Sequence, residues 1–208
     1  MAEEVVALAG GVGAARFLEG LAGVFPPDRL VIIGNTADDL ELHGLHISPD
    51  LDTVAYTLAG LADPLQGWGV AADTFECLST LARYTDAWFR LGDRDLATHL
   101  YRTGLLRQGV PLSEVTRRIS CALGVRARLL PMTDDRFRTR IQTPAGTVDF
   151  QVYFVQRRAE DKVRGILFEG VEQARPAPGV LEAIGGAAAV IVCPSNPLIS
   201  IGPILAVP

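Results

Sequence analysis

The sequence predicts an α/β fold with a doubly wound, mostly parallel sheet that carries an inserted helical segment and a β-hairpin. Two observations support this fold class. The first 40 residues contain an apolar run, a glycine-rich turn, a helical pattern and a second apolar run, the order typical of parallel strands joined by a right-handed crossover. A further buried-strand pattern at 188–193 ends in a polar loop, where open α/β sheets bind ligands.

The first half of the pattern is explained by apolar spacing and by turn residues. Residues 5–9 are predicted to form a buried strand and 14–24 a helix. Two prolines at 26–27 end that helix. Residues 30–33 have the length and composition of a second buried strand.

The elements that follow are helical first and then β. Ser48 is predicted as the N-cap of a helix that has Pro49 in its first turn. The stretch 74–123 is mostly helical and is interpreted as an insertion. A β-hairpin is predicted over about 136–155, with its second strand reaching residue 155. Another helix is expected over 176–184.

The composition is that of one globular domain over 1–208. Of the 208 residues, 49% are hydrophobic and 21% are charged, which excludes a disordered tail. The 19 basic and 24 acidic side chains give a net charge of −5. A mildly acidic chain argues against non-specific binding to nucleic acid or to a membrane surface, because such binding depends on basic patches.

No membrane-spanning segment, signal peptide or disulfide framework is expected. The longest strongly apolar run is 187–193, well short of the roughly 20 residues that cross a bilayer. The N-terminus is acidic and has no basic region. The cysteines are odd in number and lack C-x-x-C spacing, which predicts a reduced, cytoplasmic protein. We expect all three to be buried as small apolar residues: Cys77, Cys121 and Cys193.

The glycine-rich turn is the first candidate site. Gly10, Gly11 and Gly13 stand where backbone N–H groups can approach a phosphate at a helix N-terminus. The turn is neither a dinucleotide fingerprint nor a P-loop, because Arg16 holds the third glycine position, Asn35 replaces the ribose-binding acid, and no GK[ST] follows. The alternative interpretation is a tight turn that requires positive φ.

Two acidic loops form the second candidate site. Asp38 and Asp39 follow the second predicted strand, and Asp50 and Asp52 lie at a helix start. If the loops converge, their carboxylates offer oxygen ligands for Mg²⁺, which commonly links carboxylates to substrate phosphates. In the alternative interpretation the second pair complements a helix N-terminus and the first pair forms a solvated turn.

The charged segment LGDRDLATH is the third candidate. In the functional interpretation Arg94 holds an anion, Asp93 and Asp95 orient it, and Arg90 adds a second positive charge. The alternative is a solvated turn with a helix cap. His99 is interpreted as an ordinary buried or surface histidine rather than a base.

The fourth candidate is the loop CPSNP that follows the strand pattern at 188–193. Ser195 and Asn196 present a hydroxyl and an amide between two prolines, at the carboxyl end of a strand. No G-x-S-x-G motif surrounds Ser195, so a hydrolase nucleophile is not expected. The alternative is a rigid loop without a ligand.

Taken together, the motifs resemble the 2-phospho-L-lactate transferase family of coenzyme F-420 biosynthesis. The matching stretches, in the family's order, are GGVGAARFLEGL, NTADD, ISPDLDTVAYTLAG, LGDRDLATHL, LLPMTDD and CPSNPLISIGPIL. The resemblance implies a Rossmann-like core, a requirement for Mg²⁺ and a homodimer. It also implies transfer of a phospholactyl or phosphoenolpyruvyl group from a guanosine diphospho donor to the ribityl hydroxyl of the deazaflavin Fo, with release of GMP.

The resemblance also assigns residues. The metal ligands implied are Asp38, Asp50 and Asp52, and Asp52 is the expected catalytic group that accepts the hydroxyl proton. Arg90 falls where family members carry lysine, which keeps the charge but changes its geometry. Together with the motif analysis, the expected substrate-binding residues are Gly10, Gly11, Gly13, Asn35, Asp52, Arg90, Asp93, Arg94, Asp95, Ser195 and Asn196.

Two further expectations concern the chain end and the function class. Family chains continue beyond SIGPI, whereas this one ends at Pro208, so we expect part of the family fold to be missing and turnover by the isolated chain to be low. One alternative function is a nucleotide-sugar-binding regulator similar to the gluconeogenesis-factor group. Another is a nicotinamide-dependent oxidoreductase, which Arg16 and Asn35 disfavour.

Overall fold

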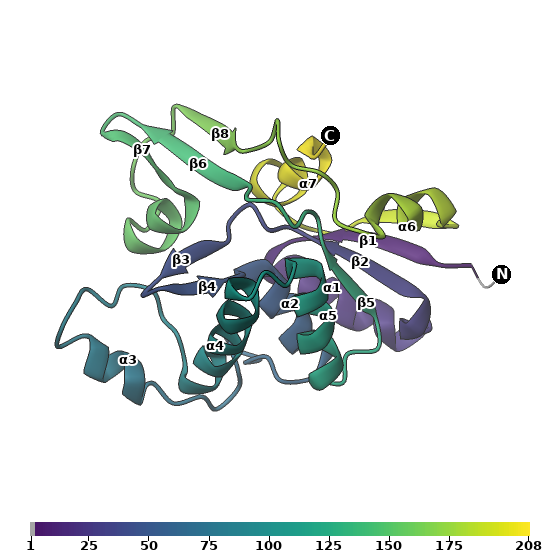
Figure 1. The fold of residues 1–208 in the computed structure, drawn as a ribbon, viewed down its shortest axis with the longest axis horizontal. Coiled ribbons are helices and arrows are strands. Elements are labelled where there is room, and N and C mark those ends of the chain that lie inside the picture. The colour runs from purple at the N-terminus through teal and green to yellow at the C-terminus, as the bar shows by residue number, and fades with distance from the viewer. Residues whose placement is uncertain (1–2) are drawn as a thin grey trace.

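The computed structural model describes residues 3–208 and contains a parallel sheet of four strands in the order β5-β2-β1-β9 (Figure 1). β1 (Val5–Ala9) pairs in parallel with β2 (Leu30–Gly34) on one side and with β9 (Ala189–Val192) on the other. β5 (Arg128–Pro131) pairs in parallel with β2. The predicted strand–helix–strand unit and the predicted strand at 188–193 are confirmed.

Helices cover both faces of this sheet, so the doubly wound arrangement is confirmed (Figure 1). One buried apolar cluster joins the sheet to α1 (Gly11–Val24), α2 (Pro49–Leu58) and α5 (Leu112–Ala122). A second cluster on the other face includes α6 (Val180–Gly186) and α7 (Gly202–Ala206). Successive residues of β1 alternate between the two clusters, as the period of two in a strand requires.

The helical insertion is confirmed and is followed by a small antiparallel sheet. The insertion contains α3 (Glu76–Leu81), α4 (Asp93–Arg107) and α5. The antiparallel sheet has the order β7-β6-β8 and consists of β6 (Arg138–Thr143), β7 (Gly146–Asp149) and β8 (Gly165–Glu169). The remaining short elements are β3 (Leu40–Leu42), β4 (Leu45–Ile47), a 3-10 turn (Pro27–Arg29) and two π-helical turns (Val152–Gln156 and Pro197–Ile201).

Three sequence expectations need correction. The second hairpin strand ends at Asp149 rather than at 155, because the aromatic residues that follow form a π-helical turn against the cavity described below. Ser48 holds the N-cap position, but its hydroxyl donates to Asp39 instead of capping the helix. Cys193 is buried, whereas Cys77 and Cys121 lie on solvent-facing sides of their helices.

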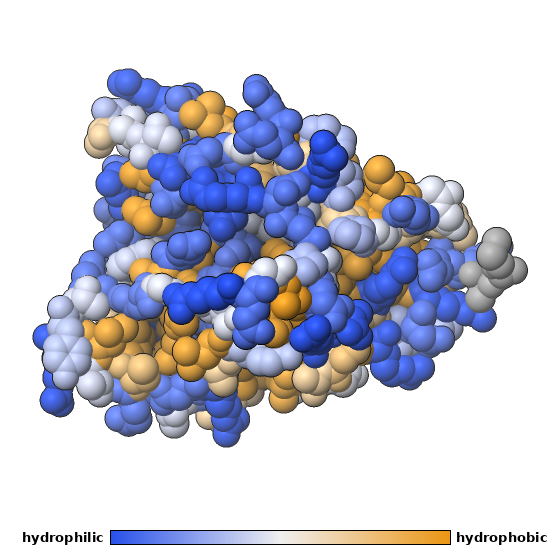
Figure 2. Space-filling model, in the orientation of Figure 1, coloured by the Kyte–Doolittle hydropathy of each residue, from blue (hydrophilic) through white to orange (hydrophobic). Residues whose placement is uncertain are grey.

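The outer surface is mixed in character. Figure 2 shows apolar side chains in separate groups among polar ones on the face that it displays. Within residues 3–208, no helix combines the length and the apolar character needed to span a bilayer.

Candidate functional site

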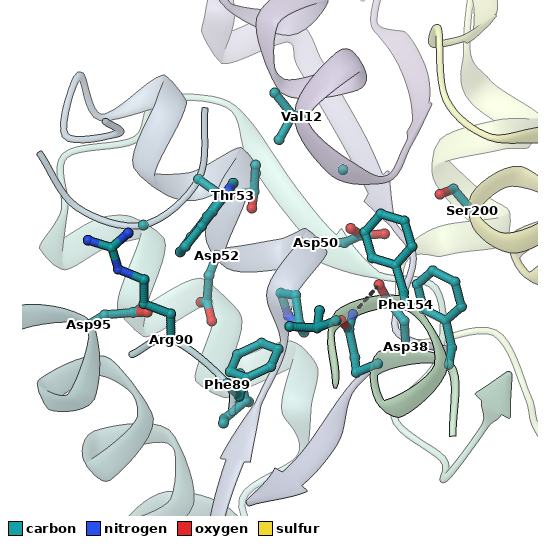
Figure 3. Close-up of a pocket in the computed structure, with 18 of the residues that line it drawn as sticks. Val12, Asp38, Asp50, Asp52, Thr53, Phe89, Arg90, Asp95, Phe154 and Ser200 are labelled. Carbon is teal, nitrogen blue, oxygen red and sulfur yellow. Dashed lines mark hydrogen bonds between the residues drawn. The ribbon is translucent and has the colours of Figure 1, made fainter. Parts of the chain in front are cut away.

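A cavity of about 540 Å³ opens at the carboxyl edge of the parallel sheet. The loops that follow β1, β2 and β9 meet there with the start of α2 and with the first π-helical turn (Figure 3). This is the edge at which open α/β sheets bind ligands, and the volume suits a molecule of nucleotide or flavin size. The apolar part of the wall consists mainly of Val12, Ile47, Trp68, Phe89, Phe150 and Phe154.

The cavity brings together most of the residues predicted from sequence. Those that line it are Gly11, Asp38, Asp50, Asp52, Arg90, Asp95 and Asn196. Those that support its wall from behind are Gly10, Asn35 and Ser195. The remaining three predicted residues neither line the cavity nor support its wall: Gly13, Asp93 and Arg94.

The glycine turn serves close packing as well as access to the cavity. Gly11 has φ +72°, as the tight-turn interpretation expects, and lines the cavity at the start of α1. A Cβ atom on Gly13 would lie 2.5 Å from the backbone oxygen of Pro194. The N–H of Gly10 donates to the Ser195 hydroxyl at 3.3 Å. The turn therefore seats α1 directly on the loop after β9, and leaves only its first residues to face a ligand.

Asn35 joins the two acidic loops. Its side-chain nitrogen lies 3.0 Å from an oxygen of Asp38 and 2.9 Å from an oxygen of Asp50. Gln151 donates to the other oxygen of Asp38 at 3.2 Å. The convergence of the loops is confirmed, and the residue that stands in place of a ribose-binding acid acts as the clamp between them.

The Asp38–Asp50 pair lies in surroundings that disfavour negative charge. Burial raises the pKa of Asp50 to about 6; the charge of Asp39 acts in the same direction, and hydrogen bonds from Asn35 and from the Gly11 N–H oppose it. Burial also raises the pKa of Asp38 well above its ordinary value, and the charges of Asp50 and Asp39 add to the effect, while a backbone hydrogen bond and the charge of Arg138 oppose it. No Lys or Arg among residues 3–208 forms an ion pair with either carboxylate.

A second polar group lies on the opposite side of the cavity, as Figure 3 shows for Asp52 and Asp95. Arg102 donates through both terminal nitrogens to Asp52, at 3.0 Å for the pair Nη1–Oδ2. The same Nη1 lies 3.1 Å from Nδ1 of His99, whose Nε2 is 3.2 Å from Asp95. Tyr56 donates to Asp95 at 2.7 Å. Burial raises the pKa of Asp95, but the close approach of His99 and the hydrogen bond from Tyr56 outweigh it and leave that pKa below its ordinary value.

The second group also has the residue types of a metal site. Asp52, Asp95 and His99 each offer a ligand atom, and these atoms lie within 4.8 Å of one another. All three side chains are buried. A cation could therefore be held on either side of the cavity, and the two sides differ in whether a protein cation already balances the carboxylates.

Arg90 lies at the rim of the cavity. Its guanidinium stacks over the ring of Phe75, 4.3 Å from the ring centre, and donates to Gln66 at 3.3 Å. The side chain is exposed, so it offers a positive charge at the entrance rather than deep in the cavity.

Asp93 and Arg94 have structural partners. Asp93 accepts from the Thr74 hydroxyl at 2.6 Å and from two backbone N–H groups at the start of α3. The backbone N–H of Arg94 donates to Asp73 at 2.9 Å, and its guanidinium donates to a backbone oxygen at 3.4 Å. The expected arrangement, in which Asp93 and Asp95 orient Arg94, is absent from the described part of the chain, because the three side chains have separate partners in Thr74, Ala71 and Tyr56.

Three residues of the second polar group are not predicted from the sequence as site residues. Tyr56 and His99 line the cavity, and Arg102 lies behind Asp52. Asp95, His99 and Arg102 are spaced i, i+4, i+7, which places them on one face of α4. That spacing was the available signal. The stacked rings of Phe150 and Phe154, 5.4 Å apart, were hidden inside the predicted strand.

Comparisons with known proteins identify relatives over most of the chain. Residues 5–208 match the model of the family described as 2-phospho-L-lactate transferase CofD. A phosphoenolpyruvate transferase of Streptomyces griseus is 49% identical over 210 residues, which cover 98% of this chain and 66% of the relative. A 2-phospho-L-lactate transferase of Methanosarcina mazei is 38% identical over 205 residues, which cover 98% of this chain and 68% of the relative.

One solved structure shows the same fold at low sequence identity. A crystal structure of a UPF0052 family member from Bacillus halodurans has a TM-score of 0.66 and 20% identity, and the match covers 100% of this chain and 64% of that one. The chain thus spans about two thirds of the length of the curated relatives that it matches.

Proposed function

Because the chain belongs to the 2-phospho-L-lactate transferase CofD family, we propose that it transfers a phosphoenolpyruvyl or phospholactyl group. The proposed donor is a guanosine diphospho compound, the acceptor is the ribityl hydroxyl of the deazaflavin Fo, and the released product is GMP. The observation that carries the proposal is the buried Asp38–Asp50 pair at the N-terminus of α1, inside a cavity with aromatic walls. The relative that is 49% identical is named a phosphoenolpyruvate transferase, which favours the phosphoenolpyruvyl donor.

Asp38 and Asp50 are the proposed ligands of Mg²⁺. They supply hard oxygen atoms, and their pKa values are raised by burial while no protein cation pairs with them within residues 3–208. When bound there, Mg²⁺ would neutralise negative charge on the donor diphosphate. Asp52 is assigned to the acceptor rather than to the cation, because Arg102 already contacts both of its oxygens.

The α1 N-terminus is the proposed site of the donor phosphates. The N–H of Gly11 already contacts Asp50, whereas the backbone N–H groups of the first helical turn from Val12 onward stand at the cavity wall and favour an anion. Asn196 lines the same side of the cavity and is assigned to the nucleotide. Ser195 contributes indirectly, since its hydroxyl accepts from the backbone of Gly10.

The chemical step is a displacement at phosphorus. The acceptor hydroxyl oxygen forms a bond to the donor phosphorus as the bond to the GMP phosphate oxygen breaks, and Asp52 accepts the hydroxyl proton. A carboxylate oxygen has two lone pairs, so Asp52 can bind Arg102 and the hydroxyl together. The departing phosphate is a good leaving group, and alignment of the two substrates accounts for much of the acceleration.

The proposed function is tested by mass spectrometry of the products. The protein is incubated with Fo and Mg²⁺ and with a guanosine diphospho donor that carries enolpyruvate, lactate or glycerate. We expect GMP and a phosphodiester of Fo, with the largest yield from the enolpyruvyl donor.

A homodimer is also proposed, and sedimentation velocity measures the oligomeric state.

Binding of Fo separates this proposal from the alternative function. A transferase quenches or enhances Fo fluorescence on binding, whereas a nucleotide-sugar-binding regulator leaves it unchanged. Absence of both Fo binding and product, under conditions where the protein is folded, would contradict the proposed function.

A further inference from the structure

Arg102 is buried to an unusual degree for an arginine. Only 2% of it is exposed, and it is among the largest fully buried side chains of the protein. A guanidinium without water is costly unless carboxylates and acceptors surround it. Here Asp52 binds both terminal nitrogens, and His99 accepts from one of them.

The protons of this group can be assigned from its chemistry. A guanidinium only donates hydrogen bonds, so Nδ1 of His99, 3.1 Å from Nη1 of Arg102, is the acceptor. The histidine proton is then on Nε2, which faces Asp95 at 3.2 Å. The hydroxyl of Tyr56 donates a hydrogen bond to the same oxygen of Asp95. Each of the three potential metal ligands is thereby engaged by a protein donor.

We propose that Arg102 is a positioning residue whose guanidinium takes the place of a metal ion among Asp52, Asp95 and His99. It fixes the carboxylate of Asp52 on the acceptor side of the cavity and leaves the Asp38–Asp50 pair as the site for a divalent cation. The assignment of Asp52 to the acceptor rests on the proposed function, whereas the occupation of a metal-like site rests on geometry alone.

The geometry of α2, which carries both Asp50 and Asp52, explains why a guanidinium is needed beside Asp52. Asp50 and Asp52 lie two residues apart in the first turn of α2, so their side chains leave the helix on nearly opposite sides. One faces Asn35 and α1, and the other faces α4. Without the guanidinium, Asp52, Asp95 and His99 would form a second cation site a short distance from the first.

The inference is tested by counting bound Zn²⁺ with isothermal titration calorimetry. The wild type sets the baseline, because Zn²⁺ can also occupy the Asp38–Asp50 pair. We expect Arg102→Ala to bind one equivalent more than the wild type, and the double variant Arg102→Ala, His99→Ala to lose that equivalent. Arg107→Ala is the matched control on the same helix, since Arg107 is exposed and contacts only a backbone oxygen of Gly44. A folded Arg102→Ala protein with the wild-type stoichiometry would overturn the inference.

A second variant tests the positioning role of Arg102 if Arg102→Ala does not fold. Arg102→Lys keeps the charge but cannot bind a carboxylate with two parallel hydrogen bonds. We expect kcat to fall about 10- to 100-fold, the usual consequence of a displaced reacting group, while the KM for the guanosine donor stays within twofold. An unchanged kcat contradicts the positioning role. If the wild type makes no product from any donor, the proposed function fails, but Zn²⁺ titration of Arg102→Lys and of His99→Ala still measures which ligands the guanidinium occupies. Because lysine keeps a positive charge beside these ligands, we expect Arg102→Lys to match the wild type in stoichiometry. An extra equivalent of Zn²⁺ in Arg102→Lys would overturn the inference.

Discussion

Two aspartates from a single helical turn have opposite surroundings. Asp52 contacts a buried arginine, whereas Asp50 has only the amide of Asn35 and the backbone N–H of Gly11 to stabilise its charge. The difference depends on which element faces each side of α2 and not on the residue type. It leaves Asp52 paired with a cation and Asp50 without one among the described residues, which is the basis for the different roles proposed for them.

The raised pKa of Asp50 leads to a prediction about stability without divalent cations. The native state holds this proton up to a pH of about 6, whereas the unfolded chain releases it near 3.8. The free energy of unfolding therefore falls as the pH rises from about 4 to about 6, by on the order of 2 to 3 kcal/mol. Asp50→Asn should reduce the decline in urea unfolding curves by the share of Asp50 and leave the share of Asp38, whose pKa burial also raises; Glu172→Gln, at an exposed position, should leave the decline unchanged. A decline of equal size in Asp50→Asn would assign it to other groups.

Among the elements, α1 is placed by its contact with the loop after β9. The backbone oxygen of Pro194 occupies the space where a side chain on Gly13 would begin. Gly20, in the same helix, has no atom within 4 Å of that position. The two glycines therefore differ in what a methyl group would meet, although the sequence around them is equally helical.

This contrast predicts opposite effects for the same substitution. Gly13→Ala should lower the free energy of unfolding by about 1 to 3 kcal/mol, because backbone must move to admit the methyl group. It should also reduce turnover, since the N-terminus of α1 would shift. Gly20→Ala should raise stability by about 0.5 to 1 kcal/mol through its effect on chain entropy. Thermal and urea unfolding measure both, and a stable Gly13→Ala protein would show that the contact yields easily.

The first π-helical turn supplies a flat aromatic surface. Phe154 stacks on Phe150 at 5.4 Å with an angle of 15° between the rings, is 55% exposed and lines the cavity. Phe154→Ala should raise the KM for Fo by about tenfold or more, as loss of stacking on a planar ring does, with little change for the guanosine donor. Tyr84→Ala, which removes an exposed ring away from the cavity, is the control. An equal rise of both KM values would argue against a deazaflavin platform.

At the scale of the whole molecule, β9 is the outer strand of the parallel sheet in the described chain. Val190 and Val192 are 47% and 58% exposed, and such an edge promotes pairing between chains. Val192→Lys should lower the proposed self-association, which sedimentation velocity across a concentration series measures. Val24→Lys, at a valine on α1 that is 85% exposed, should not change it. If both variants sediment like the wild type, self-association involves another surface.

Local patterns decided the order of the elements and most of the residues at the cavity. The apolar runs, the glycine turn and the prolines predicted β1, α1 and β2, because strand and helix periodicities depend on neighbours in the chain. The strand predicted to reach 155 ended at Asp149, because Phe150 and Phe154 pack around a cavity that no local pattern reveals. Motif order also identified the acidic loops without showing how Asn35 clamps them.

The tertiary structure alone decided which charges meet. Asp52 and Arg102 are 50 residues apart, and Asp38 and Gln151 are 113 apart, so no spacing rule connects them. Charge interactions depend on distance through space and on exclusion of water, and both are set only when α4 and the π-helical turn pack against the sheet edge. For this reason the residue types of the site could be predicted from the chain, while the division of its aspartates between a free pair and an arginine-bound anion could not.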